Sequence, residues 1–334
     1  MTPPTYSIAI RTLGTAGDKF RQELESIRQQ TVRPERVVVY IAEGYPRPSF
    51  SIGEEEYVWV RKGMVAQRAL PYDEISSDCI LMLDDDVQLA PDSAERMLRA
   101  MSEHGADAVG ADVFRNHRMS FGTKIYAAVT NLVLPHRSRK WAFKVHRNGS
   151  FSYNNHPSKP FYWSQSCGGP AMLWSKNSLK KLKFEDEKWL DSLGFAFGDD
   201  LVETYKLHLN GGRLGVLYDA GVTNLDAQSS SGSFRRSPEH IYVRSKAQYM
   251  IWYRCLYCNG KGTVASHLAA AASFGFKEVW MLFVLCGAAA LKWDGHFVAS
   301  YFRGLRDARR AVRTPEFCSI PPYYIKDRRE PFKS

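Results

Sequence analysis

In the first third of the chain, segments with the hydrophobic pattern of strands alternate with segments that have the periodicity of helices. Short apolar runs rich in β-branched residues predict strands at residues 6–12, 37–41, 57–60 and 79–83. The second of these runs, VVVYI, lacks the polar alternation of a strand that faces water on one side. Such strands are buried on both faces, so the pattern favours a sheet covered by helices on either side.

Two segments between these runs have helical periodicity. Phe20, Leu24 and Ile27 recur at spacings of four and three, which puts them on one face of an amphipathic helix. This helix is expected at residues 18–30, and a second one at 64–77. Strands that alternate with helices indicate a parallel sheet, in which ligands bind at the carboxyl ends of the strands. The residues directly after each strand are therefore the candidates for chemistry.

The rest of the chain differs in composition. Its middle is rich in aromatic and turn residues, and the stretch SSSGSFRRS at 229–237 predicts a loop. Helical patterns and a basic, proline-containing tail follow. The sequence thus predicts a domain at 1–226, with halves at 1–115 and 116–226, and then a loop and a helical, basic region at 227–334.

Composition and charge limit the classes of function. With 334 residues, of which 44% are hydrophobic and 24% charged, the chain is long enough to bury a sizeable core. Its net charge of +10 suits a nucleic acid, an anionic membrane surface or an anionic small substrate. No recognised nucleic-acid-binding module accompanies this charge, so nucleic-acid binding is not expected.

The number and spacing of the cysteines indicate the cellular compartment in which the protein is expected. The chain has six cysteines without regular spacing, and its polar, proline-bearing start does not resemble a secretory leader. A reducing cytoplasm is therefore expected. Cys255 and Cys258 form a C-x-x-C, but no second pair with metal-ligand spacing accompanies them, which favours two thiols on one helical turn over a zinc or redox site.

Three consecutive carboxylates follow the predicted strand at 79–83. At the end of a buried strand, Asp84, Asp85 and Asp86 repel one another, and a hard divalent cation with oxygen ligands relieves that repulsion. The alternative is a solvated acidic turn before a helix capped by Asp92. The acidic run by itself leaves both open.

The order of several motifs resembles family 2 glycosyltransferases. In residues 61–89, a glycine-containing turn and an Ala-x-Arg segment precede an apolar strand that ends in D-x-D. Residues 167–180, CGGPAMLWSKNSLK, resemble the strand and helix beside the donor sugar, and residues 195–201, FAFGDDL, resemble the element that carries the catalytic base. The resemblance covers residues 5–226. It implies an α/β fold of the GT-A type, with a Rossmann-like, mostly parallel central sheet flanked by helices, before a helical C-terminal extension.

The resemblance also implies an activity. A family 2 enzyme moves a sugar from a nucleotide-diphosphate sugar, here foremost a UDP-sugar, to the hydroxyl of a glycan or lipid-linked acceptor, in cell-surface polysaccharide or glycan assembly. Mn²⁺ or Mg²⁺ held by Asp84 and Asp86 would neutralise the diphosphate leaving group, and Asp226 is a further candidate ligand. Asp200, with Asp199 beside it, would be the general base of an inverting transfer. Alternatively, both acids only stabilise the start of the following helix.

The residues implied in donor binding lie after the predicted strands. They are Thr12, Leu13, Glu43, Gly63, Arg68, Asp84 and Asp85. The Arg68 guanidinium is suited to phosphate oxygens or neighbouring acids, and a surface salt bridge to Asp73 is the alternative. Glu43 stands where the family usually has an aspartate that faces the base, and Arg11 stands in place of a frequent proline.

Some classes of protein share part of this pattern. A nucleotidyltransferase would have a longer glycine-rich opening than LGTAGDKF at 13–20, and a haloacid-dehalogenase-type phosphatase would have Thr or Val in place of Gln88. A catalytically silent module that binds a nucleotide-sugar or a glycan would carry the same motifs as the enzyme. Only a hydrolysis or transfer assay separates that module from a transferase.

The aromatic residues and the C-terminal region suggest further contacts. Tyr153, Tyr162 and Trp163 are candidates for stacking on an acceptor sugar, although aromatics at alternate strand positions are more often core. The apolar run at 279–291 is shorter than a spanning helix, so no transmembrane helix is expected. It precedes the arginine-rich residues 301–313, and together they suit either peripheral contact with the anionic inner face of the cytoplasmic membrane or completion of the core.

Overall fold

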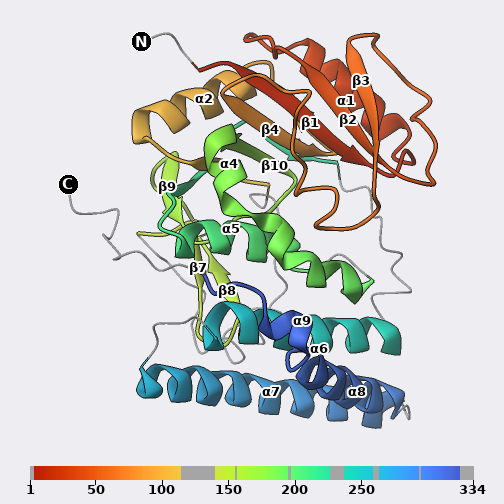
Figure 1. The fold of residues 1–334 in the computed structure, drawn as a ribbon, viewed down its shortest axis with the longest axis vertical. Helices are drawn as coiled ribbons and strands as arrows, with labels where there is room; N and C mark the ends of the chain where they lie inside the picture. Colours follow the sequence, from red (N-terminus) through yellow and green to blue (C-terminus); the bar gives the residue numbers. More distant parts are fainter. Residues whose placement is uncertain are drawn as a thin grey trace.

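The computed structural model describes residues 4–113, 140–154, 156–194, 197–225, 237–258, 263–292 and 295–323. Its centre is an eight-stranded mixed sheet of order β3-β2-β1-β4-β10-β6-β11-β9, accompanied by the pairs β12-β5 and β7-β8 (Figure 1). The strands are β1 (Tyr6–Thr12), β2 (Val37–Ala42), β3 (Glu55–Val60), β4 (Cys79–Asp84), β5 (Val87–Leu89), β6 (Ala108–Ala111), β7 (Phe143–Val145), β8 (Phe151–Tyr153), β9 (Phe161–Ser164), β10 (Ala171–Ser175), β11 (Leu214–Leu217) and β12 (Val222–Asn224).

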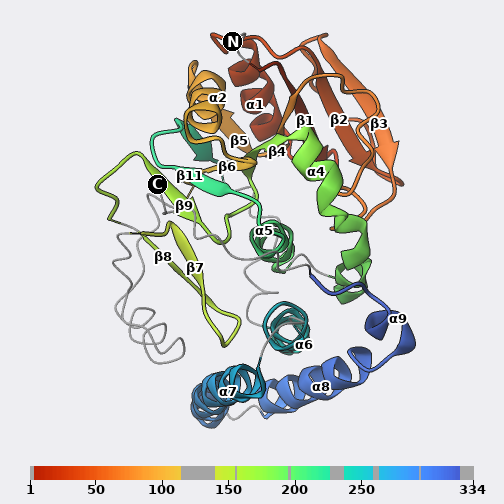
Figure 2. The same ribbon diagram turned by 60° about the vertical axis from the view of Figure 1, so that its left-hand side comes forward.

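Helices cover both faces of the sheet and form a layered C-terminal region below it. In Figure 2, α1 and α2 lie on one face and α4 on the other. The helices are α1 (Asp18–Arg28), α2 (Ser93–His104), α4 (Lys176–Leu182), the 3₁₀ helix η1 (Phe184–Leu193), α5 (Asp199–Leu209), α6 (Pro238–Trp252), the π-helix η3 (Tyr253–Tyr257), α7 (Val264–Lys292), α8 (His296–Ala311) and α9 (Pro315–Cys318).

The strands predicted from the apolar runs are confirmed as the parallel part of the sheet. β1 pairs in parallel with β2 and β4, and β2 pairs in parallel with β3. Because alternate side chains of a strand point to opposite faces, Leu81 and Leu83 pack in the core that contains α1 and α2, and Ile80 and Met82 pack in the core on the other face. β10 runs antiparallel between β4 and β6. An α/β fold with a mostly parallel central sheet flanked by helices, as expected, is therefore confirmed.

The helix expected at 64–77 is wrong. Residues 64–68 form a turn instead, near which the Gln67 amide donates to the Gly63 carbonyl at 3.0 Å and the Ala69 amide donates to the Val65 carbonyl at 2.8 Å. Pro71 lacks an amide hydrogen and disfavours helical dihedrals at the residue before it, so the helical turn cannot continue.

Three of the C-terminal helices complete the core. Met250 of α6, Ala308 of α8 and Phe317 of α9 belong to the same buried cluster as Trp174 of β10 and Leu190 of η1. These helices are therefore packed onto the sheet domain, and α8, which carries most of the arginine-rich residues 301–313, contributes one face to the core.

The fourth C-terminal helix, α7, is longer than the apolar run that predicted it. It begins at Val264, because the alanine-rich residues 265–273 continue the helix toward the N-terminus. By length and composition alone, Val264–Leu291 could cross a membrane. The length estimate from residues 279–291 therefore does not hold for the whole helix, and the expectation of no transmembrane helix stays a prediction.

A buried ion network ties the C-terminal helices to α5. Glu187 of η1 accepts hydrogen bonds from Arg254 Nε and Nη2 at 3.1 and 2.9 Å and from Trp189 Nε1 at 2.8 Å. Its Oε1 also lies 3.1 Å from Lys206 Nζ of α5. Burial alone would raise the pKa of Glu187, but Arg254 and Lys206 outweigh burial and lower it. The carboxylate therefore stays charged between two cations.

Replacing Glu187 by Ala should destabilise the fold by about 3 to 5 kcal/mol, because Arg254 would remain as a buried cation without its carboxylate and Lys206 would keep only Asp186. Urea unfolding measures this change in the free energy of unfolding. The matched control is Glu185→Ala, at an exposed position of the same helix, which should change it by less than about 0.5 kcal/mol. Equal effects of the two variants would contradict the network's role.

Candidate active site

The carboxyl ends of β1 and β4 bring basic, hydroxyl and acidic side chains together. Arg11 lies opposite Asp84 in the strand register, and its Nη2 is 2.5 Å from Asp84 Oδ1. The neighbouring Thr12 hydroxyl donates a hydrogen bond to the Asp85 carboxylate. Three of the residues expected at the donor site, Thr12, Asp84 and Asp85, are thus adjacent, and Arg11, which the sequence marked only as a departure from the family, belongs with them.

A second group of acids lies at the start of α5 and converges on Arg68. The Arg68 Nη2 forms ion pairs with Asp200 and, at 2.9 Å, with Asp199 Oδ2, and its Nη1 donates to Glu203 Oε2 at 3.0 Å. Arg68 itself is buried. The sequence named Asp199 and Asp200 but missed Glu203, which lies one helical turn after them and therefore on the same side of α5.

Gly169 connects the two groups. Its amide donates to Asp200 Oδ2 at 2.9 Å, and its carbonyl accepts from Arg11 Nη2 at 3.3 Å. A Cβ at this position would lie 2.1 Å from Asp200 Oδ1, so only glycine allows the Asp200 carboxylate to approach the backbone this closely. The small residues before β10 thus hold the acids of β4 and α5 at one edge of the sheet.

The sheet edge at the carboxyl ends of β1 and β4 carries more negative than positive charge. Burial raises the pKa of Asp84, Asp199 and Glu203, although Arg68 opposes this effect at all three. Burial also raises the pKa of Asp85 to about 6, against the hydrogen bond from Thr12. These shifts show that the cluster holds its negative charge at a cost, which a cation or a proton would reduce.

Glu23 of α1 is a buried acid that the sequence analysis missed. It is fully buried, and neither carboxyl oxygen has a hydrogen-bond partner among the described residues. Burial first, and then the charges of Asp85, Asp84 and Asp86, raise the pKa of Glu23 well above its usual range. A signal was present in the sequence, because Glu23 lies three residues after Phe20 and four before Ile27, on the apolar face of the helix.

The remaining expected donor residues have different surroundings. The Asp191 carboxylate fills the space beside Gly63, where a Cβ would lie 2.6 Å from Asp191 Oδ2, so this glycine makes room for η1. Glu43 is exposed in the turn after β2, and Leu13 is exposed after β1, both at the same sheet edge as Asp84.

The expected metal ligands are only partly described. Asp86 is half-buried at the turn between β4 and β5, and Asp226 lies outside the described residues. Leu225, which precedes it, donates its amide to the Asp86 carbonyl at 2.8 Å. Among the described residues, no group of three or more His, Cys, Asp or Glu side chains is arranged to hold a metal. Mg²⁺-type sites that use one or two carboxylates plus substrate phosphates do not need such a group, so Asp84 and Asp86 fit a cation shared with a diphosphate.

The aromatic residues expected at the acceptor site are packed within the fold. Tyr162 is buried in the core, and its hydroxyl accepts from the Ser158 amide at 2.9 Å. Arg213 lies 4.7 Å from the centre of the Trp163 ring, and the Tyr153 hydroxyl binds the Asp112 carboxylate. At successive positions of β9, Tyr162 and Trp163 face the two opposite cores, so the core interpretation holds for Tyr162.

Asp85→Asn should stabilise the protein without divalent cations. The unfolded carboxyl titrates near pKa 3.9, so between about pH 4 and 6 the folded protein keeps a proton that the unfolded chain has lost. The stabilising contribution of the protonated group is therefore lost as the pH rises through 6. We expect Asp85→Asn to be more stable by about 1 to 2 kcal/mol near pH 8, and equal to the original chain near pH 4.

Thermal unfolding with a chelator at both pH values measures this effect. Asp73→Asn, at an exposed position, is the control and should change nothing at either pH. A loss of stability in Asp85→Asn near pH 8 would show that the charged carboxylate is instead favourable in the fold.

Several solved structures are similar to this chain. The mannosyltransferase PcManGT from Pyrobaculum calidifontis, solved with GDP-Man and Mn²⁺, is 12% identical with a TM-score of 0.49, over 93% of this chain and 87% of that chain. S. aureus TarS is 13% identical with a TM-score of 0.48, over 93% of this chain and 50% of that chain. GalNAc-T7, solved with UDP, GalNAc and Mn²⁺, is 11% identical with a TM-score of 0.49, over 83% and 55%. This chain thus spans about half the length of the latter two.

Sequence comparison gives a match to one family. No curated protein matches the chain. Residues 60–154 match the family model described as Glycosyl transferase family 2, and this range includes Arg68 and the acids at the end of β4. Residues 60–154 therefore form a region of the glycosyl transferase family 2, as the motifs predicted, and this region supports a transferase enzyme.

Proposed function

We propose that this glycosyltransferase moves a sugar from a nucleotide-diphosphate sugar to an acceptor hydroxyl by a metal-dependent, inverting reaction. One observation carries the proposal: the acids at the end of β4 and at the start of α5 meet at one sheet edge, joined through Gly169. A direct displacement requires an acid-rich donor side and a separate carboxylate for the acceptor proton. The acids of β4 supply the donor side, and the acids of α5 supply the separate carboxylate. The resemblance favours a UDP-sugar as donor and a glycan or lipid-linked acceptor.

Asp200 is the carboxylate best suited to act as general base. Its side chain is 32% exposed, compared with 11% for Asp199 and 0% for Glu203, so among the acids bound to Arg68 it is the one open to an acceptor hydroxyl. The Arg68 guanidinium and the Gly169 amide both contact its carboxylate, and they fix the direction of its oxygens. In this role Asp200 takes the proton of the attacking hydroxyl.

Of the two partners that the sequence analysis allowed for Arg68, phosphate oxygens and neighbouring acids, the contacts favour the acids. Its guanidinium binds three carboxylates, which leaves few donors for phosphate oxygens. Arg68 is therefore a positioning residue that orients Asp200 and offsets the charge of Asp199 and Glu203.

On the donor side, Asp84 and Asp86 would hold Mn²⁺ or Mg²⁺, which would supply Lewis-acid stabilisation to the departing diphosphate. Arg11 fixes Asp84 from β1, and Thr12 fixes Asp85. Asp84 and Asp85 are thus oriented before any ligand binds, so these two side chains need little reorganisation during the reaction.

Asp200→Asn should separate binding from chemistry. Asparagine keeps the size and the hydrogen bond from Gly169 but removes the basicity, so turnover should fall by about 10² to 10⁴ while nucleotide affinity stays within about twofold. Transfer assays and calorimetry measure the two quantities. Asp199→Asn is the matched control, and we expect a smaller loss of turnover because its side chain is less accessible. Near-normal transfer by Asp200→Asn would remove the assignment of the base.

Asp86→Asn should weaken metal-dependent donor binding. Loss of one carboxylate ligand should lower the Mn²⁺-dependent affinity for a nucleoside diphosphate by at least about tenfold, as measured by calorimetry. The fold should persist, because the Asp86 side chain is half-buried at a turn. Asp219→Asn, an exposed aspartate in the turn after β11, is the control and should bind normally. Unchanged metal-dependent affinity in Asp86→Asn would place the cation elsewhere.

A further inference from the structure

The helix α7 has one packed face and one uncovered face. On the packed face, the ring of Phe274 stacks on Trp252 at 4.3 Å, and Leu285 packs against Tyr301 and Leu305 of α8. Only 18% of the most apolar window of the helix is buried. Most of its apolar surface is therefore in contact with neither α6 nor α8.

The exposed large side chains of α7 form one apolar side of the helix. They recur at spacings of three or four residues and multiples of these, with exposures from 39% at Trp280 to 86% at Leu291. They are Val264, Leu268, Phe276, Val279, Trp280, Phe283, Val284 and Leu291. On α8, Phe302 adds another exposed ring at 51%. Apolar surface of this extent marks a contact site.

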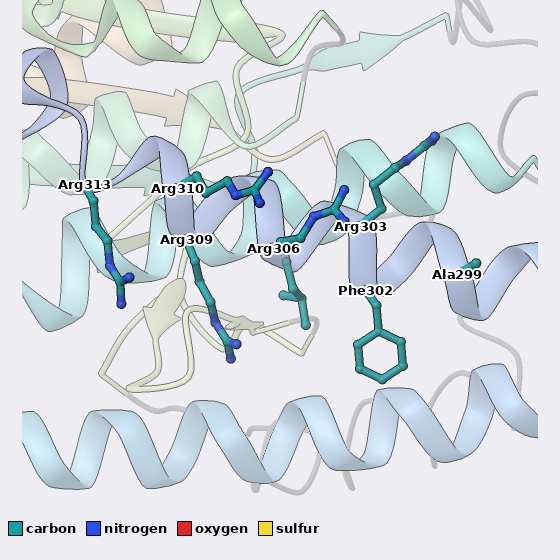
Figure 3. A pocket seen from close by; sticks show the side chains of 8 residues that line it. Ala299, Phe302, Arg303, Arg306, Arg309, Arg310 and Arg313 are labelled. Atoms are coloured by element: carbon teal, nitrogen blue, oxygen red, sulfur yellow. The ribbon is translucent and has the colours of Figure 1, made fainter.

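Arginines of α8 lie beside this apolar surface. A groove of about 680 Å³ is lined by Ala299, Phe302, Arg303, Leu305, Arg306, Arg309, Arg310 and Arg313. Figure 3 shows Phe302, Arg309 and Arg313 pointing from α8 toward the side on which α7 lies. Arg303 and Arg306 pair with Glu239 and Asp307. Within the described part of the chain, Arg309 and Arg313 form no ion pair with a carboxylate, and Arg310 shares Asp307 with Arg306, so most of the positive charge of these three arginines is available to an anionic partner.

The position of the two helices suits contact with an extended surface. In Figures 1 and 2, α7 and α8 form the outermost layer of the molecule, and α6 lies between this layer and the sheet domain. Nothing in the described part of the chain covers the outer side of α7. Apolar side chains beside arginines match the two zones of a lipid leaflet, acyl chains and anionic headgroups.

We propose that α7 and α8 bind the surface of an anionic membrane, with α7 lying in the plane of the interface. The apolar side of α7 enters the boundary between headgroups and acyl chains, and Arg309, Arg310 and Arg313 bind headgroup phosphates.

An in-plane position fits α7 better than a spanning one. Lys277 and Glu278 lie in the middle of the helix on its packed face, where Glu278 binds the Tyr301 hydroxyl of α8. In a spanning helix these charges would lie near the bilayer centre, and α7 would have to leave α6 and α8. In the plane of the interface, the charges keep their protein contacts.

Flotation of the full chain with vesicles tests this proposal without donor or metal, so its outcome is independent of sugar transfer. The chain should float with phosphatidylcholine vesicles that contain phosphatidylglycerol, much less with phosphatidylcholine alone, and less at high salt because attraction to the headgroups is screened.

Two variants with matched controls test contact with the anionic headgroups and contact with the acyl chains separately. Arg309→Gln with Arg313→Gln should lower partitioning to anionic vesicles by about 30-fold, since each basic residue near the surface contributes about fivefold. Arg21→Gln with Arg28→Gln, exposed on α1, is the control. Phe283→Ser should lower partitioning by about tenfold at any salt concentration, whereas Phe151→Ser, at an exposed phenylalanine of β8, should not. Thermal unfolding should show that all four remain folded.

Several outcomes would overturn the proposal. They are recovery in the soluble fraction with every vesicle, equal binding to neutral vesicles, and equal losses in variants and controls. Binding that resists high salt and alkaline extraction would instead indicate a spanning helix. A dimer that Phe283→Ser abolishes, without vesicle binding, would assign the surface to a second copy of the chain.

Discussion

Negative charge gathered at one sheet edge is the constraint on which the arrangement of this enzyme depends. The parallel strands deliver Asp84 and Asp85 to the same edge at which α5 begins with its own acids. Unpaired buried carboxylates cost several kcal/mol each, so the fold must supply cations from the protein. Arg68 is the main one, because its guanidinium holds three acids of α5 at once. The turn that carries Arg68 and the first turn of α5 are thereby fixed relative to each other.

The same interactions explain how a fixed site can serve two halves of a reaction. Arg11 and Thr12 orient the acids of β4, whereas Arg68 and the Gly169 amide orient Asp200. Since Gly169 contacts both groups through its backbone, a movement of one group is transmitted to the other over a short, stiff path. The raised pKa values of Asp84 and Asp85 show that the protein's cations do not fully offset the charge. A divalent cation with its diphosphate would complete the balance.

Local patterns predicted the strands and the acids that follow them, because hydrophobic period and strand ends are properties of neighbouring residues. They failed where distant residues decide the structure. The partners of Arg68 lie more than a hundred residues later in the chain, so the sequence could not decide between phosphate oxygens and acids as its partners or identify which acids it binds. Glu23 was missed because an acid on an apolar helix face is unusual, and its raised pKa depends on burial and on the charges of the distant β4 acids. The length of α7 was underestimated because alanines carry high helix propensity but weak hydrophobic signal.

The C-terminal helices differ in how completely the sheet domain covers them, and this difference follows from their order in space. α6 lies next to the core and buries Ala247 and Met250 there, while η3 beside it packs on α5 and shares the Glu187 network. α7 contacts the far side of α6, η3 and part of α8, so most of its apolar surface is not covered by the described residues. Because α6, η3 and α5 form one packed unit, any surface that binds α7 would also set the orientation of Asp200 relative to that surface.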